Sequence, residues 1–465
     1  MFYQRRFFIL VGVVVVLLLF TWHRAIRPLM KPINYTGGDL LGEPPSYEGI
    51  KEWEAKLPQH DLDLPFPEGR TGRYAKFSNQ IKALGWNNVL NELLLCTHLA
   101  YESKRAYVFQ DYHWKPEYYP WRIPIPPPPA PIPIPRTPIN ALIAGPTAGG
   151  PWDPNDTAPR SVSDDYWELV CPPEDRDLIY TDNIKPELQD AEGDVVLRRW
   201  TEIIRDSPKR CVEVLPGPSE ADPYPQTFDL WLIGYKRLLS LWPIFKSSPT
   251  SRLFDTSPLV KAAVDRNEYL FLPRGPRPSV PASRNPYDRM MALHIRRGDF
   301  KEACFSLATW NSTFYGWNQL PELPDSFTPP PGGSWGSNTP ENVEFYLEHC
   351  FPTFEAIVQK IRDTKEAYIA NGTDRVLDVM YLLTNADVRW VEEFKEVVRR
   401  DGWGTIVTSK DLILDDEQIG VGMAVDMEIA RLAAVFIGNG WSSFTSNIIH
   451  RRLVDGKEPL ANRFW

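Results

Sequence analysis

Two adjacent arginines follow an apolar segment in the C-terminal part of the chain. The segment reads MALHIRRGD, so that Arg296 and Arg297 stand directly before a glycine. Guanidinium groups at the carboxyl end of a strand can hold a diphosphate through paired, charge-assisted hydrogen bonds. A surface ion pair with Asp288 or Asp299 is the alternative interpretation of the same residues. The motif therefore indicates a phosphate site but does not decide between the two.

A second cluster begins a predicted helix near the C-terminus. The sequence FIGNGWSSFTSNI, residues 436–448, places a Gly-Asn-Gly turn after an apolar strand and hydroxyl side chains at the helix start. The N–H groups of a helix N-terminus attract phosphate, although an ordinary capping serine needs no ligand. The residues of this cluster are Ser442, Ser443, Phe444 and Thr445.

Asp426 precedes Ser442 by sixteen residues, on the preceding predicted helix. Its carboxylate has three candidate partners: Arg431, a backbone group, and the donor edge of a nucleotide base. The last of these would make Asp426 part of the same site as the helix start. The sequence around it leaves the three alternatives open.

A glycine-to-asparagine turn, GWNN at Gly85–Asn88, stands in the N-terminal part of the chain. It follows a predicted strand near Arg73 and precedes an apolar helix, after which AYVFQ at Ala106–Gln110 predicts a second strand. A strand, turn, helix and strand in this order form one βαβ unit.

Together these motifs resemble those of the GDP-fucose-dependent fucosyltransferases, especially the protein O-fucosyltransferase branch. The family pattern is a Gly-to-Asn turn in the first βα unit, an H-[LIV]-R strand end, and an aspartate spaced to S-S-F-[ST]. Here they stand as GWNN, as HIRRGD at His294–Asp299, and as Asp426 before Ser442–Thr445. The double arginine is more similar to the α1,6-fucosyltransferases. The matches span roughly residues 73–450, in the family's order.

The resemblance implies how each residue acts on the donor. His294 and Asp426 would hold the guanine or ribose side of GDP, and Arg297 would be a second phosphate contact. Hydroxyls and main chain at the helix start would contact phosphate and base. The donor-binding set implied by the resemblance is His294, Arg297, Asp426, Ser442, Ser443, Phe444, Thr445 and Gly85.

The resemblance also implies the residues that act on the reaction. Arg296 would bind the β-phosphate and stabilise the leaving GDP, and Asn88 would face the fucose and the acceptor. Some family members carry a glutamate before the first-lobe glycine as general base, but Leu84 stands there. Glu92, one helical turn beyond Asn88, is a substitute candidate. The alternatives are that Glu92 is a solvated helix residue, or that a dissociative reaction needs no base.

The order of predicted elements indicates an α/β fold. After residue 281 strands and helices alternate, which predicts a parallel sheet with helices on both faces. With the resemblance, we expect a GT-B-like protein of two Rossmann-like lobes. The expected division is a cytoplasmic tail (1–6), a transmembrane anchor (7–22), a stem (23–68), an acceptor-side lobe (69–280) and a nucleotide-sugar-binding lobe (281–465).

The anchor prediction rests on residues 7–22, FFILVGVVVVLLLFTW, which carry no charge. A cleaved signal peptide is the rival interpretation, but no small-x-small cleavage site follows. Four N-x-S/T sequons come after the segment, at Asn34, Asn155, Asn311 and Asn371. We therefore expect a single-pass type II protein of the Golgi or endoplasmic reticulum membrane, with its catalytic body luminal and glycosylated.

Proline is unevenly distributed. The chain has 46 prolines in 465 residues, and eleven of them lie between Pro116 and Pro138. A run of this kind provides few backbone donors, so an extended polyproline II loop is expected. It is interpreted as a stiff surface insertion, or else as a platform for a peptide acceptor or partner.

The cysteines and histidines bear on disulfides and metals. We expect the bridges Cys171–Cys211 and Cys304–Cys350, the second closing a loop beside Arg296, with Cys96 a buried free thiol. The seven histidines form no cluster with metal-ligand spacing, so no metal cofactor is expected. The net charge of −9 argues against nucleic acid as a partner.

The resulting expectation is a membrane-anchored enzyme that transfers fucose from GDP-fucose to a protein or glycan hydroxyl, with inversion and without a metal. A second hypothesis keeps the fold but changes the donor to another nucleotide sugar. A third is a non-catalytic luminal binding protein of the same fold.

Overall fold

The computed structural model describes residues 35–36, 38, 40, 42–126, 129–218, 222–272, 285–298, 300–372 and 375–465. The predicted tail (1–6) and anchor (7–22) and the sequon at Asn34 lie outside these residues. Among the residues that are described, no helix is both long and apolar enough to cross a membrane.

The chain forms two compact units, which are described separately. The smaller one combines Met1–Glu43 with Lys115–Pro135, and the larger one combines Pro44–Trp114 with Arg136–Trp465. In the smaller unit, β1 (Tyr35–Thr36) pairs antiparallel with β5 (Ile123–Pro124). Part of the proline segment is therefore a short strand rather than an isolated polyproline II loop. The pairing is only two residues long, and short or edge strands of this kind tolerate proline.

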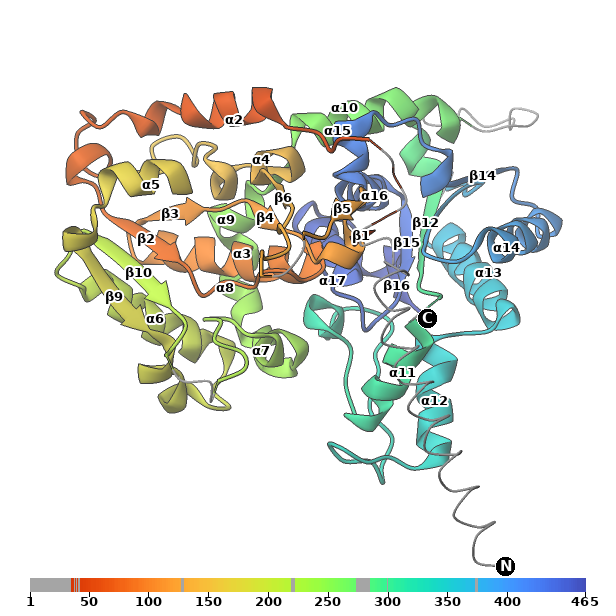
Figure 1. Ribbon diagram of the computed structural model, residues 1–465. Helices are drawn as coiled ribbons and strands as arrows, with labels where there is room; N and C mark the ends of the chain where they lie inside the picture. Colours follow the sequence, from red (N-terminus) through yellow and green to blue (C-terminus); the bar gives the residue numbers. More distant parts are fainter. Residues whose placement is uncertain are drawn as a thin grey trace, which may run out of the picture. The chain divides into compact units, whose positions relative to one another are not determined.

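The first lobe of the larger unit is built on a five-stranded parallel sheet of order β8-β3-β2-β10-β9 (Figure 1). Its strands are β2 (Tyr74–Phe77), β3 (Ala106–Phe109), β8 (Val162–Ser163), β9 (Arg176–Tyr180) and β10 (Cys211–Leu215). Its connecting helices include α3 (Trp86–Glu102), α5 (Asp164–Val170) and α6 (Gly193–Asp206). The βαβ unit predicted around the GWNN turn is thus β2, α3 and β3.

Shorter elements complete this lobe. Up to residue 272 they are the helices α2 (Glu48–Ala55), α4 (Ile139–Leu142), α7 (Leu230–Gly234), α8 (Trp242–Ser247), α9 (Pro249–Arg252) and α10 (Pro258–Asn267), and the paired strands β4 (Tyr112–His113), β6 (Arg136–Thr137), β7 (Ile143–Ala144) and β11 (Asp255–Thr256). The predicted bridge Cys171–Cys211 is present and ties the end of α5 to β10. Cys96 is buried in α3 as a free cysteine, as expected.

The segment before residue 69 differs from the expected stem. Leu57 is buried, and Gln59 donates hydrogen bonds from Nε2 to the carbonyls of Gly149 and Ser161, both at 2.8 Å. The backbone N–H of Ser163 donates to Nε2 of His60 at 3.1 Å. Residues 57–60 therefore pack into the first lobe, which begins earlier in the chain than the composition indicated.

The second lobe is a five-stranded parallel sheet of order β14-β13-β12-β15-β16. Its strands are β12 (Met290–Ile295), β13 (Val379–Thr384), β14 (Thr405–Thr408), β15 (Val435–Gly438) and β16 (Asn462–Phe464). Its helices are α11 (Phe300–Thr309), α12 (Pro340–Cys350), α13 (Phe354–Ala370), α14 (Val388–Arg400), α15 (Asp416–Ile419), α16 (Gly422–Leu432) and α17 (Ser443–Val454). The expected α/β class with parallel sheets is confirmed.

Helices cover both faces of this second sheet (Figure 1). Leu293, Ile357 of α13 and Phe394 of α14 belong to one buried cluster, which places α13 and α14 on the same face. Tyr381 of β13 donates a hydrogen bond to Asp426 of α16, so α16 covers the opposite face. Successive residues of a strand point to opposite faces, so each of these buried strands reads as a continuous apolar run.

The apolar pattern over Val343–Tyr368 predicts one long helix, but the structure has two. α12 ends at Cys350, and α13 begins at Phe354 after a cap in which Thr353 Oγ1 accepts from the N–H of Ala356 at 3.3 Å. Pro352 explains the break, because proline has no N–H and its ring clashes with the preceding turn of a helix. The predicted bridge Cys304–Cys350 joins α11 to α12.

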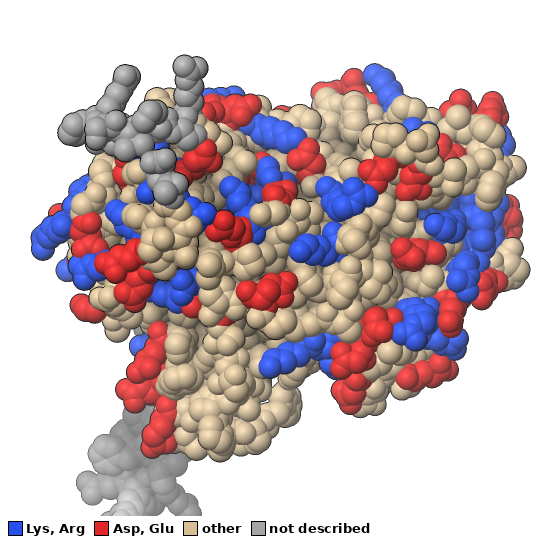
Figure 2. Space-filling model, turned by 180° about the vertical axis from the view of Figure 1, so that it is seen from behind, with Lys and Arg blue, Asp and Glu red and all other residues tan. Residues whose placement is uncertain are grey.

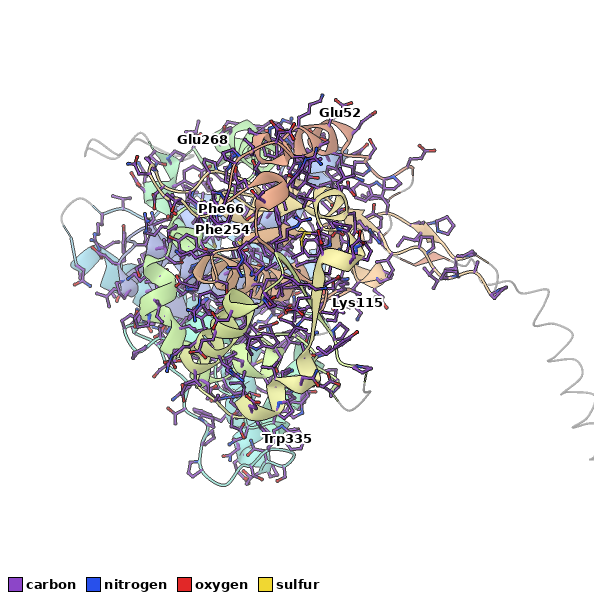
Figure 3. All side chains as sticks on the ribbon, turned by 90° about the vertical axis from the view of Figure 1, so that its left-hand side faces the viewer. Glu52, Phe66, Lys115, Phe254, Glu268 and Trp335 are labelled. Atoms are coloured by element: carbon purple, nitrogen blue, oxygen red, sulfur yellow. A yellow bond between two sulfur atoms is a disulfide. The ribbon has the colours of Figure 1, made fainter. Side chains whose placement is uncertain are left out.

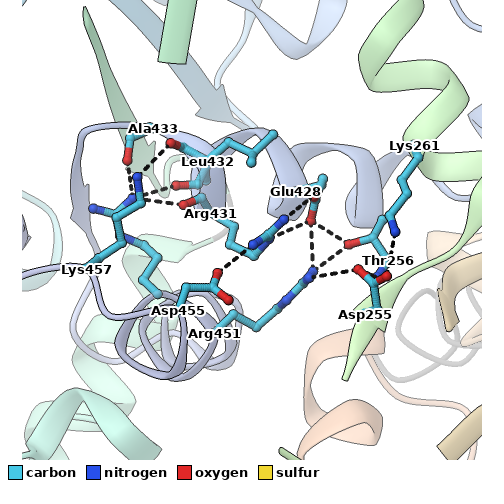
Figure 4. A network of polar contacts seen from close by, with 12 residues as sticks. Asp255, Thr256, Lys261, Glu428, Arg431, Leu432, Ala433, Arg451, Asp455 and Lys457 are labelled. Atoms are coloured by element: carbon cyan, nitrogen blue, oxygen red, sulfur yellow. Dashed lines mark hydrogen bonds and ion pairs between the residues drawn. The ribbon is translucent and has the colours of Figure 1, made fainter. Parts of the chain in front are cut away.

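A buried polar network joins the two lobes (Figure 4). Arg451 of α17 donates to Glu428 of α16 at 2.9 Å and to Thr256 of β11 at 2.7 Å. Arg431 makes two further hydrogen bonds to the same carboxylate and one to Asp455. Both Glu428 and Arg451 are almost fully buried. A charged group in this position is stable only because every partner is present.

The charged residues on the surface are exposed to water, in contrast to Glu428 and Arg451 of the buried network. On the face seen in Figure 2, Lys and Arg side chains are intermingled with Asp and Glu side chains. One example is Arg389, which pairs with Glu393 one turn later on α14, where both side chains are exposed. Exposed pairs of this kind contribute little to stability.

We expect Glu428→Gln to lower the free energy of unfolding by roughly 3–5 kcal/mol, because it leaves the buried Arg451 and the partly buried Arg431 without their shared carboxylate. Glu393→Gln is the matched control on an exposed pair and should change stability by less than about 0.5 kcal/mol. Urea unfolding followed by tryptophan fluorescence measures both. Equal effects of the two substitutions would contradict the role given to the network.

The same carboxylate predicts an acid-sensitive fold. Burial alone would raise the pKa of Glu428, but the hydrogen bond from Arg431 and the charge of Arg451 outweigh burial and lower the pKa to about 2. The stabilisation is therefore complete above pH 4.5, the ordinary pKa of a glutamate, and is lost as the pH falls from there towards 2. The Glu428→Gln variant should lack this part of the pH dependence.

Candidate functional site

The candidate site lies where the strand order of the second, all-parallel sheet reverses, at β12. Strand β12 is followed in the sheet by β13 on one side and by β15 on the other, and ligands of such sheets bind at the carboxyl ends of the strands at this point. His294 is near the end of β12, and Thr445 is in the first turn of α17, directly after β15. His294 Nδ1 and Thr445 Oγ1 are hydrogen-bonded at 2.9 Å. The ring of Phe444 lies 4.8 Å from the imidazole, centroid to centroid.

Local sequence explains this juxtaposition. Leu293 and Ile295 point into the core under α13 and α14, so strand alternation directs His294 to the opposite face. Gly438 at the end of β15 lets α17 approach, because a Cβ at this position would lie 2.6 Å from Cγ2 of Thr445. The carbonyl of His294 also accepts a hydrogen bond from the indole of Trp465, at 2.9 Å.

The imidazole of His294 is neutral at physiological pH. Burial, together with the positive charge of Arg296, lowers the pKa of His294 to about 3. A neutral ring has one donor and one acceptor nitrogen. His294 can therefore orient a ligand by hydrogen bonding, but it adds no charge to the site.

The structure does not bring Arg296 and Arg297 together. Arg296 is half-buried, and its guanidinium lies over the ring of Phe300, 4.7 Å from the centroid. Arg297 is buried, and its guanidinium lies 4.3 Å from the ring centroid of Phe351 and 4.9 Å from that of Trp390.

Arg297 is held on the face away from His294. Its guanidinium donates to the carbonyl of Pro352, and its backbone N–H donates to Oδ1 of Asn385 at 2.7 Å. Burial lowers the pKa of Arg297 to about 10. The structure thus gives Arg297 a packing role between α14 and the turn that precedes α13, and it does not support the predicted second phosphate contact.

The start of α17 is suited to an anion. Ser442 is the N-cap residue, but its side chain makes no capping hydrogen bond. Ser443 and Phe444, which are half-buried, follow in the first turn. Backbone N–H groups and the positive end of the helix dipole at such a position favour a phosphate.

Asp426 has partners that the sequence did not indicate. Its carboxylate accepts hydrogen bonds from the hydroxyl of Tyr381 at 2.5 Å and from that of Ser409 at 2.8 Å. Arg431 pairs with Glu428 instead, so the alternative pairing of Asp426 with Arg431 is wrong. Burial raises the pKa of Asp426 to about 6, although both hydrogen bonds act to lower it. Ser409 directly follows β14, so this carboxylate lies at the carboxyl edge of the sheet.

Asn88 reaches the second lobe through a residue that the sequence analysis missed. The hydroxyl of Tyr315 donates to Oδ1 of Asn88 at 3.2 Å, and the backbone N–H of Tyr315 donates to the carbonyl of Gly440 at 2.9 Å. Tyr315 belongs to the loop between Cys304 and Cys350, and Gly440 to the turn before α17. Gly85 is the N-cap residue of α3, so the whole GWNN turn is the start of that helix.

The same loop supports the turn before α17 a second time. Asn318 donates from Nδ2 to the carbonyls of Gly440 and Ser442, at 2.9 and 3.3 Å. The positions of Cys304 and Cys350 predicted the disulfide that closes this loop, but no sequence pattern within the loop indicated a role for Tyr315 or Asn318. Only their contacts in the folded chain identify them.

Glu92 is neither a solvated helix residue nor placed as a base. It is 1% exposed, and its Oε2 accepts from the N–H of Ile81 at 2.7 Å. Burial raises the pKa of Glu92 well above the ordinary value. A carboxyl that is buried and already engaged by a backbone N–H is not accessible to an acceptor hydroxyl. The sequence-based role of Glu92 as a substitute base is therefore not supported.

Within the described ranges, no group of three or more His, Cys, Asp or Glu side chains has a geometry that could hold a metal ion.

Comparison with known proteins finds likeness only among solved structures. No family model and no curated protein matches the chain. POFUT1 in complex with GDP-fucose matches with a TM-score of 0.47 and 14% identity, over 82% of this chain and 94% of that one. NodZ α-1,6-fucosyltransferase soaked with GDP-fucose matches with a TM-score of 0.37 and 11% identity, over 81% and 92%. Fucosyltransferase NodZ from Bradyrhizobium gives a TM-score of 0.37 and 12% identity over the same shares.

These are likenesses in fold at low identity. Because the TM-scores of these matches are below 0.5, functional conclusions rest on the residues of this chain.

The buried state of Glu92 predicts a stability effect that increases with pH. Because the pKa of Glu92 is raised in the folded state, the unfolded chain gains from ionising above pH 4.5, and this destabilises the fold. We expect Glu92→Gln to be more stable than the unsubstituted protein above pH 4.5, by up to about 1.4 kcal/mol per pH unit until the folded pKa is reached.

Urea unfolding of both proteins at several pH values from 4 to 8 measures this difference. The two should have equal stability near pH 4, where the glutamate is protonated in both states. A Glu92→Gln variant that is less stable at neutral pH would show that the carboxyl is ionised in the folded protein.

Proposed function

We propose that the protein transfers fucose from GDP-fucose to a hydroxyl group of a protein or glycan acceptor. One observation carries the proposal. His294 and Arg296 of the HIRRGD motif and the Phe444–Thr445 pair of the second motif lie together at the switch point of a parallel sheet. Asn88 of the third motif faces the same region through Tyr315.

The donor would lie along the carboxyl edge of the second sheet. Arg296 and the first N–H groups of α17 would bind the diphosphate, because both are positive and lie at adjacent strand ends. Asp426 and His294 would hold the guanine or ribose. Guanine presents adjacent N–H donors, and a carboxylate matches two such donors at once. The hydrogen bonds from Tyr381 and Ser409 fix the orientation of that carboxylate.

The reaction follows from where charge develops. Cleavage of the sugar–phosphate bond leaves oxocarbenium character on the fucose and negative charge on GDP. A guanidinium fixed at the β-phosphate stabilises that charge as it forms. We propose a metal-independent, inverting transfer in a GT-B-like arrangement, with the acceptor hydroxyl attacking from the side of Asn88. Since Glu92 is not a base, a dissociative transition state that needs little proton abstraction is favoured.

Two other hypotheses remain to be separated by experiment. Another nucleotide sugar could use the same phosphate-binding residues, and its base would then need to match Asp426. A non-catalytic binding protein would retain the site without turnover, and the absence of a glutamate at Leu84 permits it. Calorimetric titration with GDP and UDP distinguishes the donors, and release of fucose from GDP-fucose distinguishes an enzyme from a binding protein.

We expect Arg296→Ala to weaken GDP binding about 10- to 100-fold, because one charge-assisted phosphate contact is lost. Hydrolysis and transfer of the fucose should become undetectable. Arg389→Ala removes an exposed arginine of α14 and is the control, for which GDP affinity should be unchanged. Wild-type turnover in Arg296→Ala would remove Arg296 from the reaction.

We further propose that the protein is a single-pass type II protein of the Golgi or endoplasmic reticulum membrane, with its folded body in the lumen. The uncharged segment 7–22 and the sequons support this proposal. Asn155 and Asn371 are exposed, whereas Asn311 is only half-exposed and its amide oxygen is buried. Accessible side chains are what a glycosylating enzyme requires.

The full-length chain expressed in eukaryotic cells should therefore carry N-glycans at Asn155 and Asn371, with Asn311 unoccupied. Peptide mapping after glycosidase treatment measures occupancy at each site, and Asn155→Gln should abolish one glycan. A chain that is found in the cytosol without glycans would contradict the luminal location.

A further inference from the structure

A groove that no motif indicated lies on the first lobe. It consists of two adjoining cavities of about 560 and 620 Å³, which share Gln189, Asp190, Trp231 and Arg237. The larger cavity is bounded on one side by Trp335, which belongs to the loop between Cys304 and Cys350. Residues of both lobes therefore line one continuous surface, here called the aromatic groove.

Three partly exposed aromatic side chains line this groove. Trp231 and Tyr235 lie on and just after α7, with ring centroids 6.2 Å apart and planes inclined by 35°. Trp335 is 67% exposed and is labelled at the lower end of Figure 3. An exposed tryptophan at the rim of a cavity costs free energy in water, which a ligand with an apolar face can recover.

The groove adjoins the candidate site. Gly234, the last residue of α7, lies between Trp231 and Tyr235 in the sequence. A Cβ at this glycine would be 3.9 Å from the ring of Tyr315. The hydroxyl of the same Tyr315 donates to Asn88. A ligand in the groove could therefore extend towards the place where the fucose would be transferred.

The polar groups of the groove are planar and accessible. Gln189 and Asp190 are exposed, and Arg237 is half-buried with one N–H bonded to the carbonyl of Ala191. An amide, a carboxylate and a guanidinium can each engage two neighbouring hydroxyl groups at once. They stand beside the aromatic rings, so one ligand could meet both.

The charge of the groove restricts its ligand. Its only basic lining residues among those described are Lys185 and Arg237, against four aspartates, Asp182, Asp190, Asp222 and Asp229. Lys185 is already paired with Asp222 at 2.9 Å and with Asp229 at 3.0 Å. An anionic ligand would thus meet a net negative surface and be repelled.

We propose that the aromatic groove binds the acceptor and that this acceptor is a neutral oligosaccharide. A sugar ring has C–H faces that pack on aromatic rings and hydroxyl edges that suit Gln189, Asp190 and Arg237. Sialylated or sulfated chains are disfavoured by the aspartates. A flexible peptide would need its backbone N–H and C=O groups paired, and none of the described residues that line the groove belongs to a strand. The assignment as acceptor site rests on the proposed fucosyl transfer, whereas saccharide binding itself does not.

Saturation-transfer NMR of the full-length chain in detergent tests the proposal. The probes are cellotetraose, mannotetraose and chitotetraose at millimolar concentration, with sialyllactose and a flexible Ser/Thr peptide for comparison. We expect at least one neutral tetrasaccharide to bind, and Trp231→Ala and Trp335→Ala to weaken it about tenfold each. Trp231→Phe should retain most of the affinity. Trp53→Ala removes a 51% exposed tryptophan of α2 outside the groove and is the matched control.

Several outcomes would overturn the proposal: no neutral tetrasaccharide binds, binding is equal in the groove variants and the control, or the peptide or sialyllactose binds at the groove instead. Calorimetry with GDP on the same samples keeps the two proposals apart. GDP binding without saccharide binding refutes the groove alone, and saccharide binding without GDP binding refutes the donor. Because Trp335 is exposed, its substitution should leave the fold intact, so a loss of binding cannot be attributed to unfolding.

Discussion

Burial of β12 on both faces is the constraint on which the site depends. Each residue of this central strand must point into one of two helix-covered layers, because side chains alternate along a strand. Leu293 and Ile295 enter the core beneath α13 and α14, and His294 is thereby directed to α17. The same alternation continues beyond the strand end. It directs Arg297 to Phe351 and Trp390 on the first face and leaves Arg296 on the side of His294.

The rest of the molecule holds the first lobe against this edge. The loop closed by Cys304–Cys350 contacts the turn before α17 through Asn318 and reaches Asn88 through Tyr315. The network around Glu428 also joins α16 and α17 to β11. The buried ions are costly to desolvate, so they favour one geometry in which all partners meet. A site whose residues come from two lobes needs such fixed contacts. Small displacements of the groups that position a reaction strongly lower its rate.

Patterns of short range in the sequence predicted much of this fold. Strand β13, helix α14 and the start of α17 follow from apolar periodicity and turn residues, and both disulfides follow from the positions of the cysteines. Pro352 indicates the break between α12 and α13. The apolar periodicity continues on both sides of it, however, and therefore predicted a single helix. The placement of His294 and Arg296 on one face of the sheet needed no more than the alternation of one strand. Applied to the next residue, the same rule would have separated Arg297 from the site.

What the sequence could not provide depends on contacts between distant residues. Glu92 lies in α3, and the amphipathic pattern of this helix does not predict that the Glu92 side chain is buried against Ile81. The partners of Asp426, Tyr381 and Ser409, are 45 and 17 residues away, and each lies on or beside a different strand. Tyr315 is 227 residues from Asn88. These are tertiary relations, and no local propensity encodes them.

The distribution of charge follows from the same arrangement. The chain is acidic overall, at −9, and His294 is neutral because it is buried. With Arg297 committed to packing, Arg296 is the one basic side chain that the predicted motifs leave at this edge. The remaining attraction for a diphosphate must come from the dipole and N–H groups of α17, whose N-cap side chain is not engaged. In the proposed transfer, a single guanidinium beside a helix N-terminus would bind the diphosphate less strongly than two arginines would. This would help the nucleotide to leave after each turnover.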